Sequence, residues 1–201
     1  MLGNDVVDLG DPETRSGVRH PRFDARVFTR EERVALAEAS DPERLRWSLW
    51  AAKEAAYKCV AKRAPGTGFS PRLFEVRLES ERSGSVSHGG RRLRVRLFRD
   101  GDALHAVASD AGDPERTARL ALAELPADAD PAAASQAVRA LARYAAAALL
   151  GCPPGEIEIA RQGRVPVLRR RGAPERLDLS LSHHGRFVAA ALAARPEAGA
   201  S

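Results

Sequence analysis

Lysine is nearly absent from this chain of 201 residues. Of its 32 basic residues only Lys53, Lys58 and Lys62 are lysines, and the other cations are arginines. A lysine ammonium is a compact point charge and an arginine guanidinium is a wide planar fork, so the two are not interchangeable. The clustering of all three lysines in one short stretch therefore indicates a need for a compact ammonium there. A coding bias is the alternative, because asparagine and isoleucine are also rare.

Cysteine and long apolar runs are scarce as well. The two cysteines, Cys59 and Cys152, fit no Cys-x-x-Cys or metal-ligand spacing, which argues against a disulfide framework and a structural zinc site. The longest apolar runs, residues 144–150 and 187–194, fall far short of the roughly 18 residues that span a bilayer. Because the first residues carry two acids and no apolar core, we expect a cytoplasmic protein without membrane contact.

Aromatic residues make up only 5% of the chain. Hydrophobic residues make up 44% of it, and this fraction suffices for a buried core. The formal net charge of +5 favours an anionic partner. That partner could be a nucleic acid, a phosphorylated small molecule or an acidic protein. A nucleic-acid-binding module has little support, because few aromatic side chains are available to stack on bases and no recognition motif occurs.

The first part of the chain predicts two helices and an antiparallel sheet. Thr29 and Glu32 have the spacing of a capping box, and Pro42 stands at the first position of a longer helix that ends before Pro65. Within this second helix, apolar residues recur at steps of three and four, which places them on one face. Alternation at period two predicts strands over residues 3–9, 73–78, 93–97 and 104–108. Between them we expect a mobile, Ser/Gly/Arg-rich loop over residues 81–92.

The same order of helix, strand and hairpin then occurs again. An Ala-rich helix is predicted over residues 131–150, with Gly151 past its end. Strands are predicted over residues 156–159 and 165–168 and, as a hairpin, over 177–183 and 187–192. This order predicts an α+β protein of two similar halves, each a helix packed on a small antiparallel sheet, related by a pseudo-twofold axis. We place the halves and a flexible tail at residues 1–112, 113–193 and 194–201.

Residues 50–58, W-A-A-K-E-A-A-Y-K, place charged side chains on the predicted long helix. Glu54 and Lys58 are four residues apart and share a face, whereas Lys53 points well around the helix from them. On spacing alone, Glu54 and Lys58 can also be an ordinary surface ion pair that stabilises the helix by roughly 0.3 kcal/mol.

Two acids lie on the strand predicted over residues 3–9. Asp5 and Asp8 are three residues apart and therefore point to opposite faces of that strand. Either acid alone can serve as a cap or bind water. Together with Glu54, however, they would supply the hard oxygen ligands that Mg²⁺ takes, with phosphate oxygens completing the coordination shell.

Near the end of the chain, residues 179–184 (L-S-L-S-H-H) alternate in polarity and predict a strand with Ser180, Ser182 and His184 on one face. Adjacent histidines on a strand point apart, which makes them a poor metal pair, and Ser182 beside His183 is not the nucleophile and base of a triad. Both can still donate hydrogen bonds to a phosphate near a hairpin tip. A solvent-exposed turn histidine is the alternative.

Three stretches taken together resemble the 4'-phosphopantetheinyl transferase superfamily, namely residues 3–9 (G-N-D-V-V-D-L), 50–58 and 181–183 (L-S-H). The middle stretch matches the family's W-x-x-K-E-x-x-x-K helix at every defining position. The resemblance extends over most of residues 1–80 and about 155–192. It implies the family's fold, with an active site in the cleft between two halves.

The chain departs from the family's pattern in its order and at one acid. The Ser-His hairpin comes last, whereas in the two-half, surfactin-type members it precedes the other motifs, so the halves look exchanged. Val7 stands where those members have a second metal-binding acid. The acid comes one residue later, at Asp8, as in the small single-half holo-carrier-protein synthases. Residues 163–166 (G-R-V-P) loosely resemble the family's adenine-side Gly-Lys-Pro segment, where only Arg164 carries over.

The resemblance implies Mg²⁺-dependent transfer of the 4'-phosphopantetheine arm of coenzyme A to a serine of an acyl or peptidyl carrier protein, with release of adenosine 3',5'-bisphosphate. By the same resemblance, the catalytic residues would be Glu54 and Lys58. The metal ligands would be Asp5, Glu54 and Asp8. The residues that bind coenzyme A and its phosphates would be Lys53, Ser182, His183 and Arg164.

Carrier proteins of this class tend to be acidic, so the basic surface finds a role in the resemblance. We expect the carrier near the first predicted helix, at Arg22, Arg26 and Arg30. Since one chain holds both halves, we expect a functional monomer. The alternative within the family is an inactive relative that binds carrier protein or coenzyme A without transfer.

Overall fold

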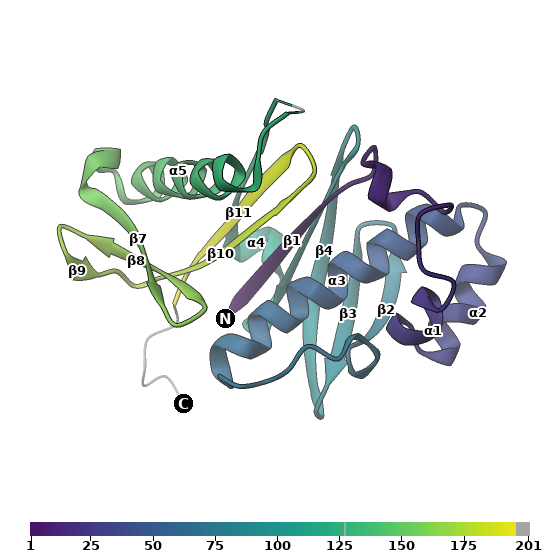
Figure 1. Cartoon of the computed structure of the whole chain (residues 1–201). Coiled ribbons are helices and arrows are strands. Elements are labelled where there is room, and N and C mark those ends of the chain that lie inside the picture. Colours follow the sequence, from purple (N-terminus) through teal and green to yellow (C-terminus); the bar gives the residue numbers. More distant parts are fainter. Residues whose placement is uncertain (127, 196–201) are drawn as a thin grey trace.

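The computed structural model describes residues 1–126 and 128–195. The fold is of the α+β class that the sequence predicts. Its first elements are β1 (Leu2–Asp8), η1 (Pro12–Thr14), α1 (Phe23–Val27), α2 (Arg30–Glu38), α3 (Pro42–Arg63), η2 (Pro71–Leu73), β2 (Glu75–Ser80), β3 (Ser83–His88), β4 (Arg91–Asp100) and β5 (Ala103–Ser109). The five strands pair antiparallel in the order β1-β5-β4-β3-β2, and α3 covers one face of this sheet (Figure 1).

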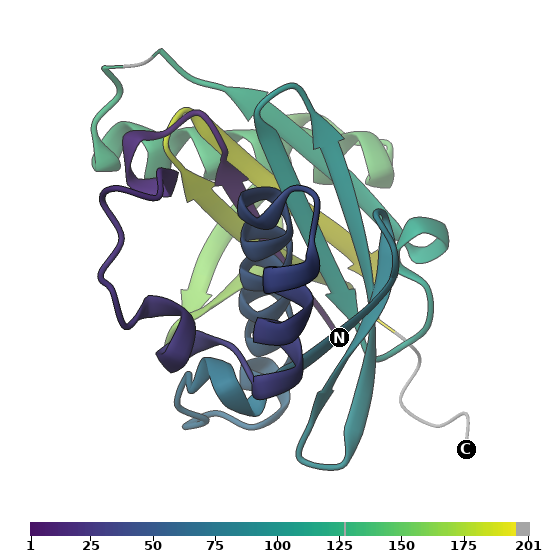
Figure 2. The same ribbon diagram turned by 90° about the vertical axis from the view of Figure 1, so that its right-hand side faces the viewer.

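A second helix-covered unit follows. Its elements are α4 (Pro114–Thr117), β6 (Ala118–Glu124), α5 (Pro131–Leu150), η3 (Pro154–Glu156), β7 (Ile157–Gln162), β8 (Val165–Arg170), β9 (Ala173–Pro174), β10 (Leu177–His184) and β11 (Phe187–Ala194). The strands form two small sheets with the orders β10-β11-β6 and β7-β8-β9, and α5 packs against both. Figure 2 shows the two units from the side, with α3 against its teal strands and the yellow hairpin β10–β11 behind.

Several local predictions are confirmed. The hydroxyl of Thr29 accepts from the Glu32 N–H (3.2 Å), and the Glu32 carboxylate accepts from the Thr29 N–H (2.8 Å), which completes the capping box. Helix α5 begins and ends at the predicted residues, and Gly151 caps it in the left-handed conformation (φ 61°). The mobile loop predicted over residues 81–92 is wrong, since most of it forms β3 and the start of β4.

Strand β6 is absent from the sequence-based prediction, because alanine is a poor strand former and the strand's partner, β11, is distant in the chain. Of the predicted tail, residues 196–201 lie outside the described residues, and Ala194 ends β11. The division of the chain at residues 112 and 113 stays a prediction. Within the described ranges, no helix combines the length and the apolar character needed to cross a membrane.

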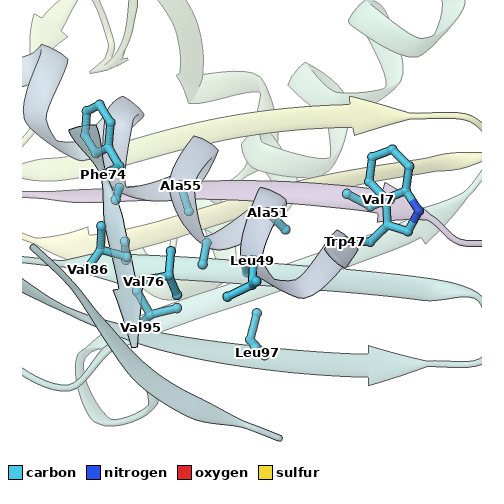
Figure 3. Close-up of a cluster of buried hydrophobic side chains, with 14 of the residues drawn as sticks. Val7, Trp47, Leu49, Ala51, Ala55, Phe74, Val76, Val86, Val95 and Leu97 are labelled. Atoms are coloured by element: carbon cyan, nitrogen blue, oxygen red, sulfur yellow. The ribbon is translucent and has the colours of Figure 1, made fainter. Parts of the chain in front are cut away.

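Helix α3 buries a face of small side chains against its sheet. Figure 3 shows part of this core, in which α3 contributes Leu49, Ala51 and Ala55 and the sheet contributes Val7, Val76, Val86, Val95 and Leu97. At Gly3, a Cβ atom would lie 2.1 Å from the Ala55 carbonyl oxygen, so only glycine lets β1 come this close to α3. The close approach brings the next side chain on that face of β1, Asp5, beside the helix.

Side chains of β10 complete the hydrogen bonding along the outer edge of β1, which is an edge strand of its sheet. Alternate β1 amides donate to alternate β10 side chains, in the pairs Leu2 to Asp178 Oδ2 (2.6 Å), Asn4 to Ser180 Oγ (2.9 Å), Val6 to Ser182 Oγ (3.2 Å) and Asp8 to His184 Nδ1 (3.1 Å). We call these four contacts the β10 ladder. A slip of one residue would turn apolar side chains toward the β1 amides, so the ladder fixes how the two units meet.

A buried histidine lies close to this junction. His105 on β5 pairs with Val6 of β1 and is 3% exposed, and the Asn4 amide lies 3.0 Å from its Nε2. Burial lowers the pKa of His105 to about 4, while the charge of Asp5 opposes the shift. The imidazole is therefore neutral in the folded protein at neutral pH.

We expect the fold to lose stability as the pH falls from 6.5 toward 4. Above this range the imidazole is neutral in the folded and the unfolded chain, whereas within it the unfolded chain binds a proton that folded His105 does not. A pKa difference of this size corresponds to roughly 3 kcal/mol. Urea denaturation across the range measures the loss, and His105→Gln should flatten the profile. Equal pH dependence in the wild type and the variant would contradict the assignment.

Candidate functional site

A cleft of about 330 Å³ opens between β1, the middle of α3 and the end of β10. The side chains in its walls include Asp5, Glu54, Lys58, Ser182 and His183. The structure thus brings together the three stretches of sequence that carry the family resemblance. A larger groove of about 880 Å³ lies between α2 and β2, but it contains none of these side chains.

Asp5 is held by two donors on one of its oxygens. Lys58 Nζ and Ser182 Oγ each lie 2.8 Å from Asp5 Oδ1, and Lys58 Nζ is also 3.3 Å from Ser182 Oγ. Asp5 is 7% exposed and lines the cleft. These contacts connect α3 and β10 through the Asp5 carboxylate.

Glu54 lies one helical turn before Lys58 and lines the same cleft. Burial raises the pKa of Glu54 to about 7, the charge of Asp5 adds to the shift, and Lys58 opposes it. The carboxylates of Asp5 and Glu54 repel each other in this cleft, and a shared cation would relieve the repulsion. Their oxygens fit Mg²⁺, which is commonly bound through one or two carboxylates with water and phosphate as further ligands. Among the described residues, no three or more His, Cys, Asp or Glu side chains form a metal cluster by themselves.

A second cleft of about 180 Å³ adjoins the first at Leu181 and His183. Its basic side chains are those of Arg139, Arg161, Arg164 and His183. Burial lowers the pKa of His183, and the neighbouring cations, Lys58 foremost, lower it further while Asp5 opposes them. The surroundings of His183 are therefore positive, which favours phosphate groups.

The sequence predicts only part of this second cleft. Arg164, in the turn between β7 and β8, is identified from the sequence and lies in the cleft with His183. Arg139 of α5, which donates to the Ser135 carbonyl oxygen (2.7 Å), and Arg161 of β7 are missed. No motif marks them, because arginine is common throughout the chain and only the packing of α5, β7 and β10 makes them neighbours.

Lys53 lines neither cleft. Its fully buried Nζ lies 2.8 Å from the Glu32 carboxylate and donates to the carbonyl oxygens of Phe74 (2.5 Å) and Pro71 (3.2 Å). Burial lowers the pKa of Lys53, and Glu32 opposes the shift. Phosphate binding, expected from the sequence, does not fit this position, because a step of one residue turns the side chain about 100° around the helix from Glu54.

Asp8 lies outside the group formed by Asp5 and Glu54. Arg186 donates to Asp8 Oδ2 through its backbone N–H (3.0 Å) and Nε (2.9 Å), and to Oδ1 through Nη2 (3.0 Å). Burial alone would raise the pKa of Asp8, but the hydrogen bonds from Arg186 and Gly10 hold it below its usual range. The position expected for a metal ligand is thus occupied by an ion pair that joins the two units.

One family model matches more than half of the chain. A model described as the 4'-phosphopantetheinyl transferase superfamily matches residues 1–120. Curated protein sequences give no significant match. Among solved structures, the chain is similar to holo-[acyl-carrier-protein] synthase from Neisseria meningitidis, with 22% identity and a TM-score of 0.43 over 54% of this chain and 96% of that one. For the ACPS–CoA complex from Chronobacterium ammoniagenes, the identity is 22% and the TM-score 0.43, over 53% of this chain and 93% of that one. For the Thermotoga maritima holo-[acyl-carrier-protein] synthase, the identity is 15% and the TM-score 0.41, over 86% of this chain and 83% of that one.

Proposed function

Because the chain belongs to the 4'-phosphopantetheinyl transferase superfamily, we propose that it transfers the phosphopantetheine arm of coenzyme A to a serine of an acyl or peptidyl carrier protein. The observation that carries the proposal is the meeting of Asp5, Glu54 and Lys58 with His183 in one cleft. These residues come from both ends of the chain and from its longest helix. The exchanged order of the motifs is therefore compatible with a single site.

Asp5 and Glu54 would hold a Mg²⁺ ion in this cleft. When bound, the ion would neutralise charge on the pyrophosphate of coenzyme A as the bond to the leaving group breaks. The raised pKa of Glu54 supports this role, since it is the property of a carboxylate that is buried beside another acid. Asp8, bound to Arg186, takes no part in the proposed ion site.

In the proposed reaction, the carrier's serine oxygen bonds to the phosphorus on the pantetheine side of the pyrophosphate. The bond from that phosphorus to the bridging oxygen breaks, which releases adenosine 3',5'-bisphosphate. Glu54 accepts the serine proton, directly or through a water molecule. Lys58, whose side chain is 28% exposed, stabilises the negative charge that develops on the leaving group.

The second, arginine-lined cleft would hold the nucleotide end of coenzyme A. It adjoins the proposed pyrophosphate position at His183, and its lining carries three guanidinium groups. Guanidinium groups bind phosphate oxygens through paired, charge-assisted hydrogen bonds. This would place the 3'-phosphate near Arg139, Arg161 and Arg164.

Replacing Arg139 with alanine is expected to raise KM for coenzyme A by about tenfold with a smaller change in kcat, because a charge-assisted hydrogen bond is lost. Arg143→Ala, one turn further along α5 and exposed, is the matched control and should change neither constant. With dephospho-coenzyme A, which lacks the 3'-phosphate, the penalty of Arg139→Ala should disappear. A tenfold penalty that persists with this substrate would contradict the placement.

The carrier protein would dock beside α1. Arg22 and Arg26 are exposed there, and the ring of Phe23 lies 5.7 Å, centroid to centroid, from Trp50 in the wall of the first cleft. Arg30, at the start of α2, extends the basic surface. Such a rim would steer an acidic carrier toward the cleft. We propose that the enzyme acts as a monomer, because both clefts are built from a single chain. We also propose that it works in the cytoplasm, as expected from its sequence.

The transfer itself can be tested on a panel of apo carrier proteins of the fatty-acid, polyketide and nonribosomal-peptide types. Each carrier is incubated with the protein, coenzyme A and Mg²⁺ and then weighed by mass spectrometry. We expect at least one carrier to gain the mass of a phosphopantetheine group, and EDTA to prevent the gain. Tight binding of coenzyme A with no mass gain on any carrier would instead identify an inactive relative.

A further inference from the structure

We infer that Ser182 is a positioning residue for the Asp5 carboxylate and does not bind coenzyme A. The inference rests on the proposed function, because it assigns Asp5 to the cation. It differs from the expectation that the resemblance raises, in which Ser182 and His183 both contact the donor substrate.

The hydrogen bonds of Ser182 leave its hydroxyl no proton for a ligand. Ser182 is 6% exposed, and its Oγ accepts from the Val6 N–H at 3.2 Å. The single hydroxyl proton points to Asp5 Oδ1 at 2.8 Å, and Lys58 Nζ approaches the same oxygen atom of Ser182 at 3.3 Å. A hydroxyl has one donor, so Ser182 would have to give up Asp5 in order to bind a phosphate.

These hydrogen bonds orient the Asp5 carboxylate. Ser182 and Lys58 both donate to Oδ1, one from β10 and the other from α3, which holds this oxygen from two sides. Oδ2 is then the oxygen left to face the cation. Groups that orient a ligand in this way commonly contribute a factor of about 10 to 100 in metal affinity.

The β10 ladder contains a matched control for this role. Ser180 is the preceding rung, is 2% exposed, and accepts from the Asn4 N–H at 2.9 Å, just as Ser182 accepts from the Val6 N–H. Ser180 donates to no metal-site residue in the described chain. Ser180→Ala and Ser182→Ala therefore each remove one equivalent contact of the β10 ladder, and only Ser182→Ala also removes the hydrogen bond to Asp5.

The experiment measures Mn²⁺ binding to the metal-free protein by electron paramagnetic resonance, without coenzyme A or carrier. Relative to the wild type, Ser182→Ala should weaken Mn²⁺ binding by about tenfold and Ser180→Ala by less than about twofold. Ser182→Thr, which retains the hydroxyl, should recover most of the affinity. Both alanine variants should lose similar thermal stability, and coenzyme A should bind Ser182→Ala and the wild type equally well in EDTA.

Equal Mn²⁺ affinity in the two alanine variants would overturn the inference, and so would a Ser182→Ala variant that loses coenzyme A affinity in EDTA. Should Ser182→Ala fail to fold, Ser182→Cys, whose thiol is a much weaker donor than a hydroxyl, provides the comparison. A wild-type protein that binds Mn²⁺ in this pattern but transfers no phosphopantetheine would contradict the proposed function and leave the role of Ser182 intact. A wild type that binds no Mn²⁺ would overturn the inference, whereas the proposed function is tested separately by the transfer of phosphopantetheine to a carrier.

Discussion

Replacing Glu54 with glutamine is expected to lower the rate of phosphopantetheine transfer by about 100- to 1,000-fold and to leave the fold intact. The substitution keeps the volume of the side chain but removes the carboxylate that would bind the cation and take up the serine proton. Stability should stay equal or rise, because Glu54 is half-buried and is repelled by Asp5. Single-turnover mass spectrometry on an apo carrier measures the rate, and circular dichroism during heating measures the stability.

Glu31→Gln serves as the control for this variant, because Glu31 is an exposed carboxylate on α2 that does not line the proposed site. It should retain the wild-type rate. A Glu54→Gln protein with full activity would show that neither the metal assignment nor the proposed base is correct. A Glu54→Gln protein that unfolds would show that the carboxylate serves the fold, which is at odds with its raised pKa.

Replacing Lys53 with methionine is expected to destabilise the protein by about 3–5 kcal/mol, a large part of the stability of an ordinary domain. The substitution leaves the Glu32 carboxylate buried without its cation and removes donors from the Phe74 and Pro71 carbonyl oxygens. Glu32 also holds the Thr29 and Val76 amides, so the damage would reach the start of α2 and β2. Urea denaturation followed by tryptophan fluorescence measures the loss.

Lys58→Met on the same helix provides the reverse case. Its side chain is 28% exposed, so the loss of stability should be small, about 1 kcal/mol, while transfer should fall sharply. The two variants together separate a lysine that holds the fold from one in the cleft. A Lys53→Met protein of normal stability with a raised KM for coenzyme A would instead support the phosphate-binding role expected from the sequence.

The three lysines have a common feature that only the structure reveals. Lys62, like Lys53, is buried, and its Nζ lies within 2.8 Å of Asp178 Oδ1 and the carbonyl oxygens of Leu2 and Leu179. Lys58 is shared by Asp5 and Ser182. In each case a compact ammonium meets acceptors from several directions, an arrangement that suits lysine better than a planar guanidinium. The sequence points to the right segment, but the main use of two of its lysines is structural.

The fold was most predictable where the signal is local. The capping box at Thr29, the start of α3 at Pro42 and the glycine cap of α5 depend on residues within one helical turn. Strands β3 and β6 were missed because Ser, Gly and Ala carry little strand preference, and their place is set by pairing with β4 and β11. The β10 ladder was predictable in part, because the alternation of polar and apolar residues in β10 is visible in the sequence, whereas its pairing with β1 is not.

The site was predictable to the extent that motifs record it. Asp5, Glu54 and His183 stand in stretches that resemble a known family, and the structure places them in one cleft. Asp8 was assigned with them, yet strand geometry turns it to the other face, where Arg186 holds it. Arg139 lies in no motif, and its position near His183 depends on how α5 packs.

We expect Asp5 and Glu54 to bind one divalent cation against the pyrophosphate of coenzyme A. A crystal structure of the wild-type protein with coenzyme A and Mn²⁺, with anomalous diffraction recorded at the manganese edge, tests it directly. We expect one anomalous peak in contact with oxygens of Asp5, Glu54 and the pyrophosphate, and the nucleotide among Arg139, Arg161 and Arg164. A peak beside Asp8 or in the groove between α2 and β2, or phosphates bound away from His183, would show that the cation or coenzyme A binds elsewhere.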